Sequence, residues 1–207
     1  MTLTVTPSRK RAQREAPDNR RGMILAAART CLSKRGARDF TLKNIAAEAQ
    51  VSISLVSHYF GSCDEVLKAV FRSVMIEPVP GEYKKARSLG EALANVRELV
   101  ARHFSDDYYS RNNLLVWLPI YEEMLLNRRT RTALDKVERE HTAKLAVTFA
   151  DVIRLRKLEV DPAALAEEFL AFLDGLWLRW CTSERKDTER ELAAAVRFLE
   201  SSLGTLR

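Results

Sequence analysis

The 207-residue sequence is poor in the residues from which disulfide frameworks and metal sites are built. Its three cysteines, Cys31, Cys63 and Cys181, are far apart and odd in number, so they predict neither a disulfide framework nor a metal-ligand spacing. With only three histidines to join them, the cysteines do not indicate a zinc or iron site. We therefore expect no metal and no cofactor.

Long apolar runs and catalytic motifs are also missing. No stretch approaches the roughly 20 apolar residues that a membrane helix needs, and residues 1–17 lack the apolar centre of a signal peptide. We expect a cytoplasmic protein with no membrane partner. The chain has no Gly-rich phosphate loop and no G-x-S-x-G elbow, and its carboxylates are scattered on polar helix faces, so the sequence argues against an enzyme.

Positive charge is concentrated at the N-terminal end. Residues 1–68 hold 12 Lys and Arg against 6 Asp and Glu, whereas residues 69–207 hold 22 of each kind, so the first part carries the whole net charge of +6. This asymmetry is typical of a head that binds a polyanion, joined to a neutral body. Residues 1–17, with basic residues from Arg9 to Arg14, predict a flexible arm that reaches the DNA backbone or minor groove; a solvated tail is the alternative.

Residues 41–60 have the pattern of a helix-turn-helix. The first part begins at Thr41, a hydroxyl N-cap, and places apolar residues on one face at helical spacing. The second part begins at Ser52 and turns Val56 and Phe60 inward. Its outward side chains are small and hydrogen-bonding instead of strongly charged, as a helix laid in the major groove requires. These outward residues are Ile53, Ser54, Ser57 and His58.

The same segment supplies the expected DNA contacts. Polar side chains at the edge of the groove are assigned to phosphates, and the centre of the second helix is assigned to base edges, with two apolar side chains meeting thymine methyl groups. The residues assigned to phosphates are Thr41, Lys43, Ser52, Ser57, His58 and Tyr59. Those assigned to bases are Lys43, Ile53, Ser54 and Leu55.

A family resemblance rests on these residues. The run from Val51 to Phe60, followed by Ser62 and residues 64–67, resembles the DNA-binding segment of TetR-type transcriptional regulators. The resemblance covers nearly the whole chain and implies a transcriptional repressor that binds a palindromic operator in double-stranded DNA as a homodimer, associated with the nucleoid when bound. Two residues depart from it. Gln50 stands at the corner, where Gly is usual, and a left-handed conformation would cost Gln about 1 kcal/mol. Cys63 stands where many members have a phosphate-binding Lys.

The helical pattern predicts an all-α fold of about nine helices, without strands. We expect a flexible arm over residues 1–17, a three-helix DNA-binding head over 18–63, and a helical bundle for ligand binding and dimerisation over 64–207. The bundle starts with a connecting helix over 64–76, before a Pro- and Gly-rich break at 77–87. Three start signals are Asp18, Thr188 and a capping box from Ser62 to Glu65. The body helices are expected over residues 88–104, 111–127, 130–158, 161–183 and 188–203.

A cavity is expected beside Pro119, because proline within a helix frees a carbonyl and bends the helix. Aromatic faces with a carboxylate at their edge suit an organic cation, especially a quaternary ammonium. The alternative is that these aromatic residues are simply core. The candidate ligand residues are Trp117, Tyr121, Glu122, Glu123, Asp174, Trp177 and Trp180. His141, alone on an apolar stripe, is interpreted as a satisfied core residue.

The last two helices indicate a partner. The helix over 161–183 is apolar on two sides, and the helix over 188–203 carries a regular apolar seam. Pairing with the same helices of a second subunit satisfies both faces, as the resemblance implies, and a two-fold protein would read a palindrome. Burial of both faces within one subunit is the alternative.

A closer resemblance concerns the effector. Residues 57–60 together with residues 174–179 are similar to the BetI-type branch, repressors of choline-to-glycine-betaine genes that respond to choline. The resemblance implies choline or a related cation as a small-molecule effector that releases the protein from DNA. Two alternatives are a ligand-independent architectural or cell-division factor and a helical protein-interaction module.

Overall fold

The computed structural model describes residues 17–75, 85–106, 108–184 and 186–206. Among these residues the regular structure consists of nine α-helices and no strand, which confirms the all-α expectation. The basic arm, apart from Pro17, and most of the Pro- and Gly-rich break lie outside the described residues. None of the described helices combines the length and the apolar character that crossing a bilayer requires.

The observed bounds agree closely with the expected ones, except for two start signals. The helices are α1 (Pro17–Arg35), α2 (Leu42–Glu48), α3 (Ile53–Phe60), α4 (Cys63–Met75), α5 (Leu89–His103), α6 (Arg111–Leu126), α7 (Arg128–Arg156), α8 (Pro162–Thr182) and α9 (Thr188–Leu203). The first helix begins at Pro17, so Asp18 lies within its first turn. The N-cap of α9 is Asp187 instead of Thr188, because the Asp187 carboxylate accepts a hydrogen bond from the Arg190 amide at 2.9 Å.

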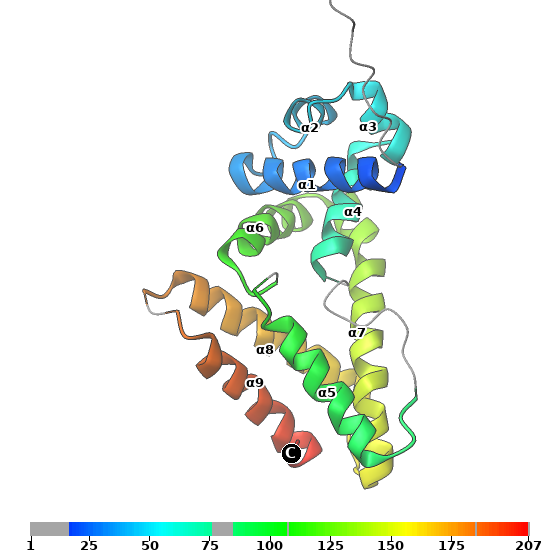
Figure 1. Cartoon of the computed structure of the whole chain (residues 1–207), viewed down its shortest axis with the longest axis vertical. Coiled ribbons are helices and arrows are strands. Elements are labelled where there is room, and N and C mark those ends of the chain that lie inside the picture. Colours follow the sequence, from blue (N-terminus) through cyan, green and yellow to red (C-terminus); the bar gives the residue numbers. More distant parts are fainter. Residues whose placement is uncertain (1–16, 76–84, 107, 185, 207) are drawn as a thin grey trace, which may run out of the picture.

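Helices α1, α2 and α3 form the head at one end of the molecule (Figure 1). Ile45 of α2 and Val56 of α3 are fully buried against Ile24 of α1 in a shared apolar cluster. Arg21 of α1 lies over the ring of Phe60, 4.8 Å from its centroid. The inward residues expected for the second helix are therefore the ones that fix it to the head.

The corner between α2 and α3 is built around Gln50. Its φ of 53° is left-handed, as expected for the position where Gly is usual. The Gln50 amide donates to the Ala47 carbonyl at 3.2 Å, and the Val51 amide donates to the Ala46 carbonyl at 2.9 Å. This pair of hydrogen bonds is a Schellman motif, which satisfies the last carbonyls of α2. The conformation is set by the turn, even though Gln has no intrinsic preference for it.

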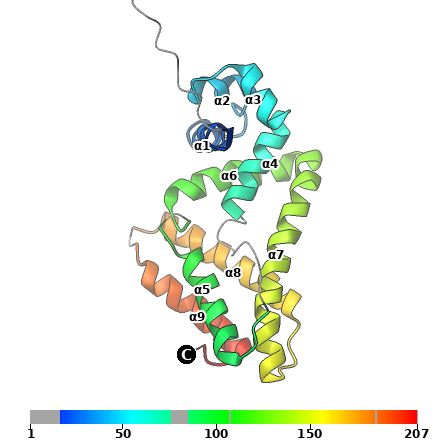
Figure 2. The ribbon, with the colours of Figure 1, turned by 45° about the vertical axis from the view of Figure 1, so that its right-hand side comes forward.

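The head is continuous with the upper part of the body. Helix α6 lies directly below α1 and beside α4, as two views show (Figures 1 and 2). Buried residues of these helices belong to the same apolar cluster as the core of the head, and Phe71 of α4 packs edge-on against Trp117 of α6 at 5.2 Å. A movement of α6 or α4 would therefore change the packing of the head.

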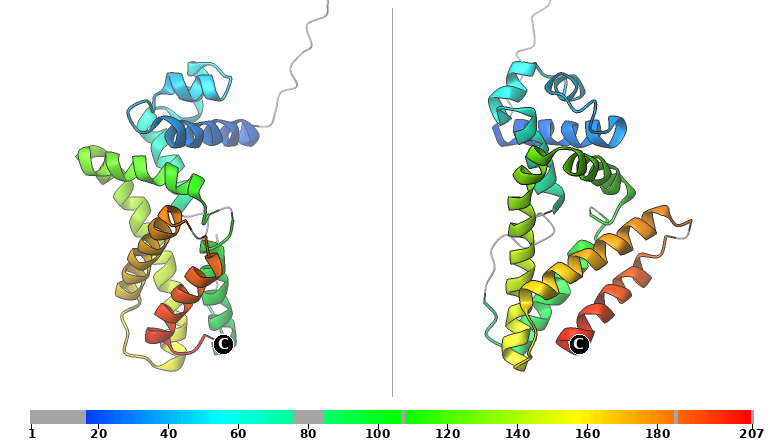
Figure 3. Two further views of the ribbon diagram at one scale, coloured as in Figure 1. Left: turned by 90° about the vertical axis from the view of Figure 1, so that its left-hand side faces the viewer. Right: turned by 180° about the vertical axis from the view of Figure 1, so that it is seen from behind.

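The lower body is a bundle of α5, α7, α8 and α9, with the C-terminus at the end far from the head (Figure 3). Its core is a second apolar cluster in which Phe149 of α7 meets Phe169 of α8 at 5.8 Å between ring centroids. Helix α7 runs from the level of α6 down the length of this bundle (Figures 1 and 2). It therefore joins the part of the molecule next to the head to the part farthest from it.

Candidate DNA-binding surface and ligand cavity

Both helices of the helix-turn-helix begin with the hydroxyl caps that the sequence predicts. The Thr41 hydroxyl oxygen accepts from the Asn44 amide, and the Ser52 hydroxyl oxygen accepts from the Leu55 amide, each at 3.2 Å. The Thr41 hydroxyl keeps its own proton for another acceptor, and the Ser52 hydroxyl forms a hydrogen bond with the Ser54 hydroxyl that leaves the pair one proton to donate. Capped helix starts with hydroxyl donors are suited to phosphate oxygens.

The outer face of α3 carries the expected contact residues. Ile53 is 48% exposed, although it is a large apolar residue. Its neighbours Ser52 and Ser54 are exposed, with their hydroxyl oxygens 2.9 Å apart. Thr41, Lys43 and His58 are also exposed, whereas Leu55, Ser57 and Tyr59 are half-buried. The structure therefore gathers the nine expected residues on α3 and on the start of α2, at the end of the molecule opposite the C-terminus (Figure 1).

Cys63 has a structural contact in place of the basic side chain common at this position. Its half-buried thiol donates to the Phe40 carbonyl oxygen, with the sulfur 3.0 Å away. Burial, helped by the nearby charge of Asp64, raises the pKa of this thiol to about 11. The Cys63 side chain is therefore neutral and supplies no positive charge for a phosphate.

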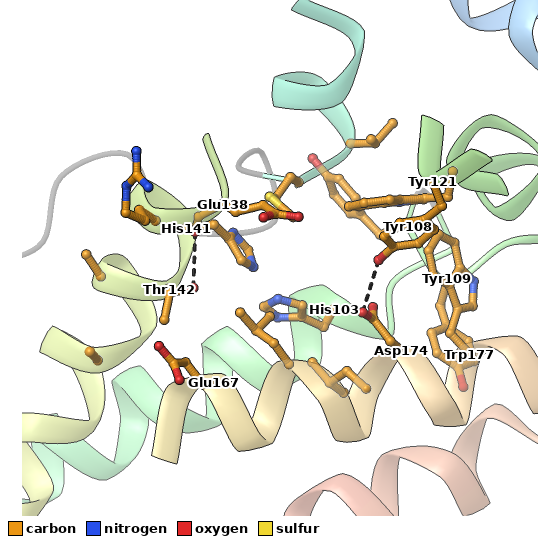
Figure 4. A pocket seen from close by; sticks show the side chains of 18 of the residues that line it. His103, Tyr108, Tyr109, Tyr121, Glu138, His141, Thr142, Glu167, Asp174 and Trp177 are labelled. Atoms are coloured by element: carbon orange, nitrogen blue, oxygen red, sulfur yellow. Dashed lines mark hydrogen bonds between the residues drawn. The ribbon is translucent and has the colours of Figure 1, made fainter. Parts of the chain in front are cut away.

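A cavity of about 630 Å³ lies in the body, with walls from α4 to α8. Its size is in the range of pockets that hold drug-sized ligands. Two apolar residues at the end of α4, Val74 and Met75, form part of the wall, so the connecting helix contacts the cavity directly. Ionisable side chains in the lining include His103, Tyr121, Glu138, His141, Glu167 and Asp174 (Figure 4).

Three aromatic residues and a carboxylate form one end of the cavity. Trp117 stacks on Tyr121 at 5.2 Å between ring centroids, and Trp177 meets Trp117 edge-on at 6.1 Å. The Tyr121 hydroxyl donates to the Asp174 carboxylate at 3.0 Å (Figure 4). We call Trp117, Tyr121, Asp174 and Trp177 the aromatic site. All four were expected from the sequence as ligand residues.

Asp174 is the charged member of the aromatic site. Its side chain is reached by solvent through the cavity, yet the surrounding protein desolvates it and raises its pKa to about 6, against the lowering effect of the Tyr121 hydrogen bond. The charge of Glu138 raises the pKa further. At neutral pH Asp174 is therefore mainly ionised, and it places a negative charge beside three aromatic rings.

Three expected ligand residues do not line the cavity. Glu122 is exposed, because it is one residue beyond Tyr121 and therefore turned about 100° around α6. Glu123 accepts a hydrogen bond from the Asn127 side chain at 2.8 Å, near the end of α6. Trp180 lies one turn beyond Trp177 and packs against Tyr109 at 4.9 Å. The expectation for these residues was wrong because helix rotation and length place them outside the cavity.

Two histidines line part of the cavity, and the sequence did not predict this role for them. His141 is only 3% exposed, as a core residue should be, but its Nδ1 has no hydrogen-bond partner among the described residues and its ring lines the cavity. The His103 ring lies 5.8 Å from it, between centroids. Burial lowers the pKa of both, that of His141 to about 3, so both are neutral at pH 7. The sequence signal for a place in the cavity lining was the pair of polar neighbours, Glu138 three residues before His141 and Thr142 directly after it.

The second helix of the helix-turn-helix is capped and exposed, and the head that carries it shares an apolar core with a body that contains a cavity. Together these features define a helix-turn-helix DNA-binding transcriptional regulator. Residues 24–70 match the sequence model described as "Bacterial regulatory proteins, tetR family", and residues 92–204 match the one described as "BetI-type transcriptional repressor, C-terminal". The chain belongs to the TetR family of transcriptional regulators and has a C-terminal domain of the BetI type. This family consists of regulators and not of enzymes.

Individual relatives agree with this assignment. The HTH-type transcriptional regulator BetI of Ectopseudomonas mendocina is 29% identical over 192 residues, 91% of this chain and 95% of the relative. Among solved structures, the fatty acid degradation regulator FadR of Bacillus halodurans has a TM-score of 0.71 at 19% identity, covering 94% of this chain and 99% of that one. A transcriptional regulator described from Saccharomonospora viridis, solved in complex with choline, has a TM-score of 0.63 at 21% identity, covering 88% and 96%. These two structures share the fold.

Proposed function

We propose that the protein is a homodimeric repressor that binds a palindromic operator and is released by a small organic cation, choline or a related compound. One observation supports the cation above all: the ionised Asp174 carboxylate lies beside the rings of Trp117, Tyr121 and Trp177 in the lining of the cavity. A quaternary ammonium donates no hydrogen bonds, so it is held by aromatic faces and by a nearby negative charge. The S. viridis regulator of the same fold was solved in complex with choline.

The cavity has a direct route to the DNA-binding head. Val74 and Met75 of α4 line it, and α4 begins three residues after the end of α3. A ligand that displaces these side chains moves the helix that supports the recognition helix. Release follows if the ligand binds the moved conformer more tightly than the DNA-competent one, because equal affinity for both shifts nothing.

The head is proposed to contact DNA through the nine residues on α3 and at the start of α2. Small and hydrogen-bonding side chains on an exposed helix suit the major groove, where base edges are read, and the capping hydroxyls suit phosphates. We place the DNA-binding head at residues 18–63 and the ligand-binding and dimerisation domain at 64–207, with 64–76 as the connecting helix. Such a regulator would work in the cytoplasm, on the nucleoid when bound to its operator.

The dimer is proposed to form through α8 and α9. Leu199 and Leu203 of α9 are fully buried within the chain, so part of the expected seam is used inside the subunit. Phe172 and Phe198 instead stack on each other at 4.7 Å between centroids and remain half-buried. Leu176, Leu192 and Val196 of the same two helices are half-buried as well. A second subunit would cover this remaining apolar surface and place two recognition helices for a palindrome.

The first test measures fluorescence anisotropy of labelled DNA that flanks the protein's own gene, with and without choline, at two salt concentrations. We expect tight binding that weakens as salt rises and is released by choline. Lys43→Ala should weaken binding and reduce the salt slope by about one. Lys157→Ala is the matched control, because Lys157 is exposed at the end of α7 far from the head and should change neither quantity.

The outcomes separate the parts of the proposal. DNA binding that responds to salt but not to choline or other cations would support the DNA-binding regulator and contradict the proposed cation effector. This result would favour the ligand-independent architectural factor. The absence of sequence-preferring binding at low salt would overturn operator binding at that locus and favour the protein-interaction module.

A further inference from the structure

We propose that the effector cavity is built for a dication, a linear diamine or polyamine with a positive group at each end, and not for a single small cation. This inference rests on the proposed binding of cations in the cavity. Asp174 and the aromatic site would hold one positive group. Glu138, beside His103 and His141, would hold the second.

The cavity is larger than one small cation requires. One quaternary ammonium of the size of choline needs only the aromatic site, whereas the cavity extends from Trp177 past His103 to His141 of α7 and has a volume of about 630 Å³ (Figure 4). Apolar side chains, Ala146 and Leu173 among them, line it together with the polar groups. A lining that combines apolar surface with separate polar groups is suited to an aliphatic chain with polar ends.

The charge of the lining also favours a dication. Three carboxylates, on Glu138, Glu167 and Asp174, line the cavity, and Arg139 is the one Lys or Arg among the described residues that does so. With three carboxylates against one guanidinium, the lining carries an excess of two negative charges. The histidines add no positive charge, because burial lowers the pKa of both. A dication would balance the lining, whereas a monocation would leave one carboxylate unbalanced.

Glu138 is the carboxylate that faces the same space as the aromatic site. It extends from α7 into the cavity close to His141, on the opposite side from Asp174 of α8 (Figure 4). Its negative charge raises the pKa of both Asp174 and Tyr121, so the three groups interact electrostatically across the cavity. Burial raises the pKa of Glu138, and the charges of Arg131 and, more weakly, Arg139 lower it; Arg131 also donates to Asp135 at 3.0 Å.

The two histidines supply an independent sign of a ligand at this end. The His103 Nδ1 lies 2.8 Å from the Leu99 carbonyl oxygen, which can only accept, so this nitrogen carries the proton and Nε2 of the neutral ring is an acceptor. His103 Nε2 and His141 Nδ1 are buried without a hydrogen-bond partner among the described residues, and His141 is only 3% exposed. The His141 ring is directed from α7 towards His103 across this end of the cavity (Figure 4). An ammonium, which has only donors, matches an acceptor nitrogen beside a carboxylate.

The test is isothermal titration calorimetry of the full-length protein with three ligands: choline, a linear alkyl monoamine, and the α,ω-diamine of the same chain length, over a series of lengths. At the matching length the diamine should bind at least about tenfold more tightly than the monoamine, as one added charge-assisted hydrogen bond predicts. Glu138→Gln keeps the size of the side chain and should remove this advantage while the affinity for choline stays within about twofold. Glu122→Gln is the matched control and should keep the advantage, because Glu122 is exposed outside the cavity.

Each outcome decides the proposal. Retained choline binding by Glu138→Gln shows that the variant is folded, and loss of choline binding as well would overturn the assignment of two separate ends. Equal affinities for diamine and monoamine at every length would overturn the dication and leave the proposed cation effector intact. An advantage that survives in Glu138→Gln would overturn the role of Glu138. If none of the three ligands binds, the proposed cation effector itself fails, and the dication fails with it.

Discussion

Arg29 of α1 donates a hydrogen bond to Asn113 of α6, with Nη2 and Oδ1 2.5 Å apart. The contact joins residues 84 positions apart in the chain and links the DNA-binding head to the helix that carries Trp117 and Tyr121. The Asn113 side-chain amide donates in turn to the Tyr108 carbonyl at 3.0 Å, and Tyr108 lines the cavity. A change in the cavity wall therefore has a polar connection to α1 in addition to the shared apolar core.

We predict that Arg29→Met reduces the coupling between effector and DNA. The variant keeps an aliphatic side chain but removes a hydrogen bond with a charged donor, which should lower the free energy of unfolding by about 1–2 kcal/mol. The effector concentration that half-releases DNA should rise, whereas effector binding without DNA should change little. Urea unfolding and the anisotropy assay measure these quantities. Arg35→Met, an exposed position at the end of α1, controls for the lost charge, and an equal effect of both variants would contradict the role of Arg29.

A second prediction concerns the corner of the helix-turn-helix. Gln50→Gly should raise the free energy of unfolding by up to about 1 kcal/mol, because Gln50 has a φ of 53° and Gly adopts this conformation without a steric penalty. Ala47→Gly, at an exposed position within α2, should lower it by about 1 kcal/mol. Thermal or urea unfolding of both variants checks the signs. A destabilising Gln50→Gly would show that the Gln side chain has contacts that outweigh its strained backbone.

These examples show which features the sequence could predict. Helix starts at Ser52 and Ser88 depend on hydrogen bonds to amides three residues away, so a local pattern is sufficient to find them. The left-handed corner at Gln50 was also predictable, since the helices on either side require a turn there. The same local reasoning misplaced the cap of α9, where Asp187 and Thr188 are adjacent and either side chain could serve.

The cavity required information that no local pattern contains. Trp117, Tyr121, Asp174 and Trp177 were found because Pro119 indicates a bend beside a cavity and because aromatic faces with a carboxylate suit an organic cation. Which of the neighbouring residues join them depends on how α6, α7 and α8 cross. His103 of α5 and His141 of α7 meet only through that crossing, so the sequence placed His141 in a core and gave His103 no role.

The buried histidine gives a prediction for stability against pH. Burial lowers the pKa of His141 from 6.5 to about 3, so between these values the unfolded chain binds a proton that the folded protein does not. The contribution of His141 to the free energy of unfolding should therefore fall as the pH decreases below about 6.5, by up to about 1.4 kcal/mol per pH unit. His103, whose pKa is also lowered, adds to the slope. Urea unfolding from pH 7 to pH 5 should show a smaller slope for His141→Gln than for the native protein, and an equal slope would contradict the burial of a neutral His141.

We predict that the proposed cation binding is sensitive to pH near 6 through Asp174. Desolvation by burial raises the pKa of its carboxyl to about 6, so acidification from pH 7 to pH 5 converts the carboxylate into a neutral acid. The neutral acid does not attract a cation, and the affinity for choline should therefore fall with decreasing pH, approaching about tenfold per unit well below pH 6 if binding requires the ionised form.

Asp174→Asn tests the source of this dependence, because it is neutral at every pH and keeps an oxygen that can accept from the Tyr121 hydroxyl. Its choline affinity should be low already at pH 7 and should change less between pH 7 and pH 5 than that of the native protein. Calorimetry at three pH values checks this expectation: a native pH dependence that persists unchanged in Asp174→Asn removes Asp174 from the cation site.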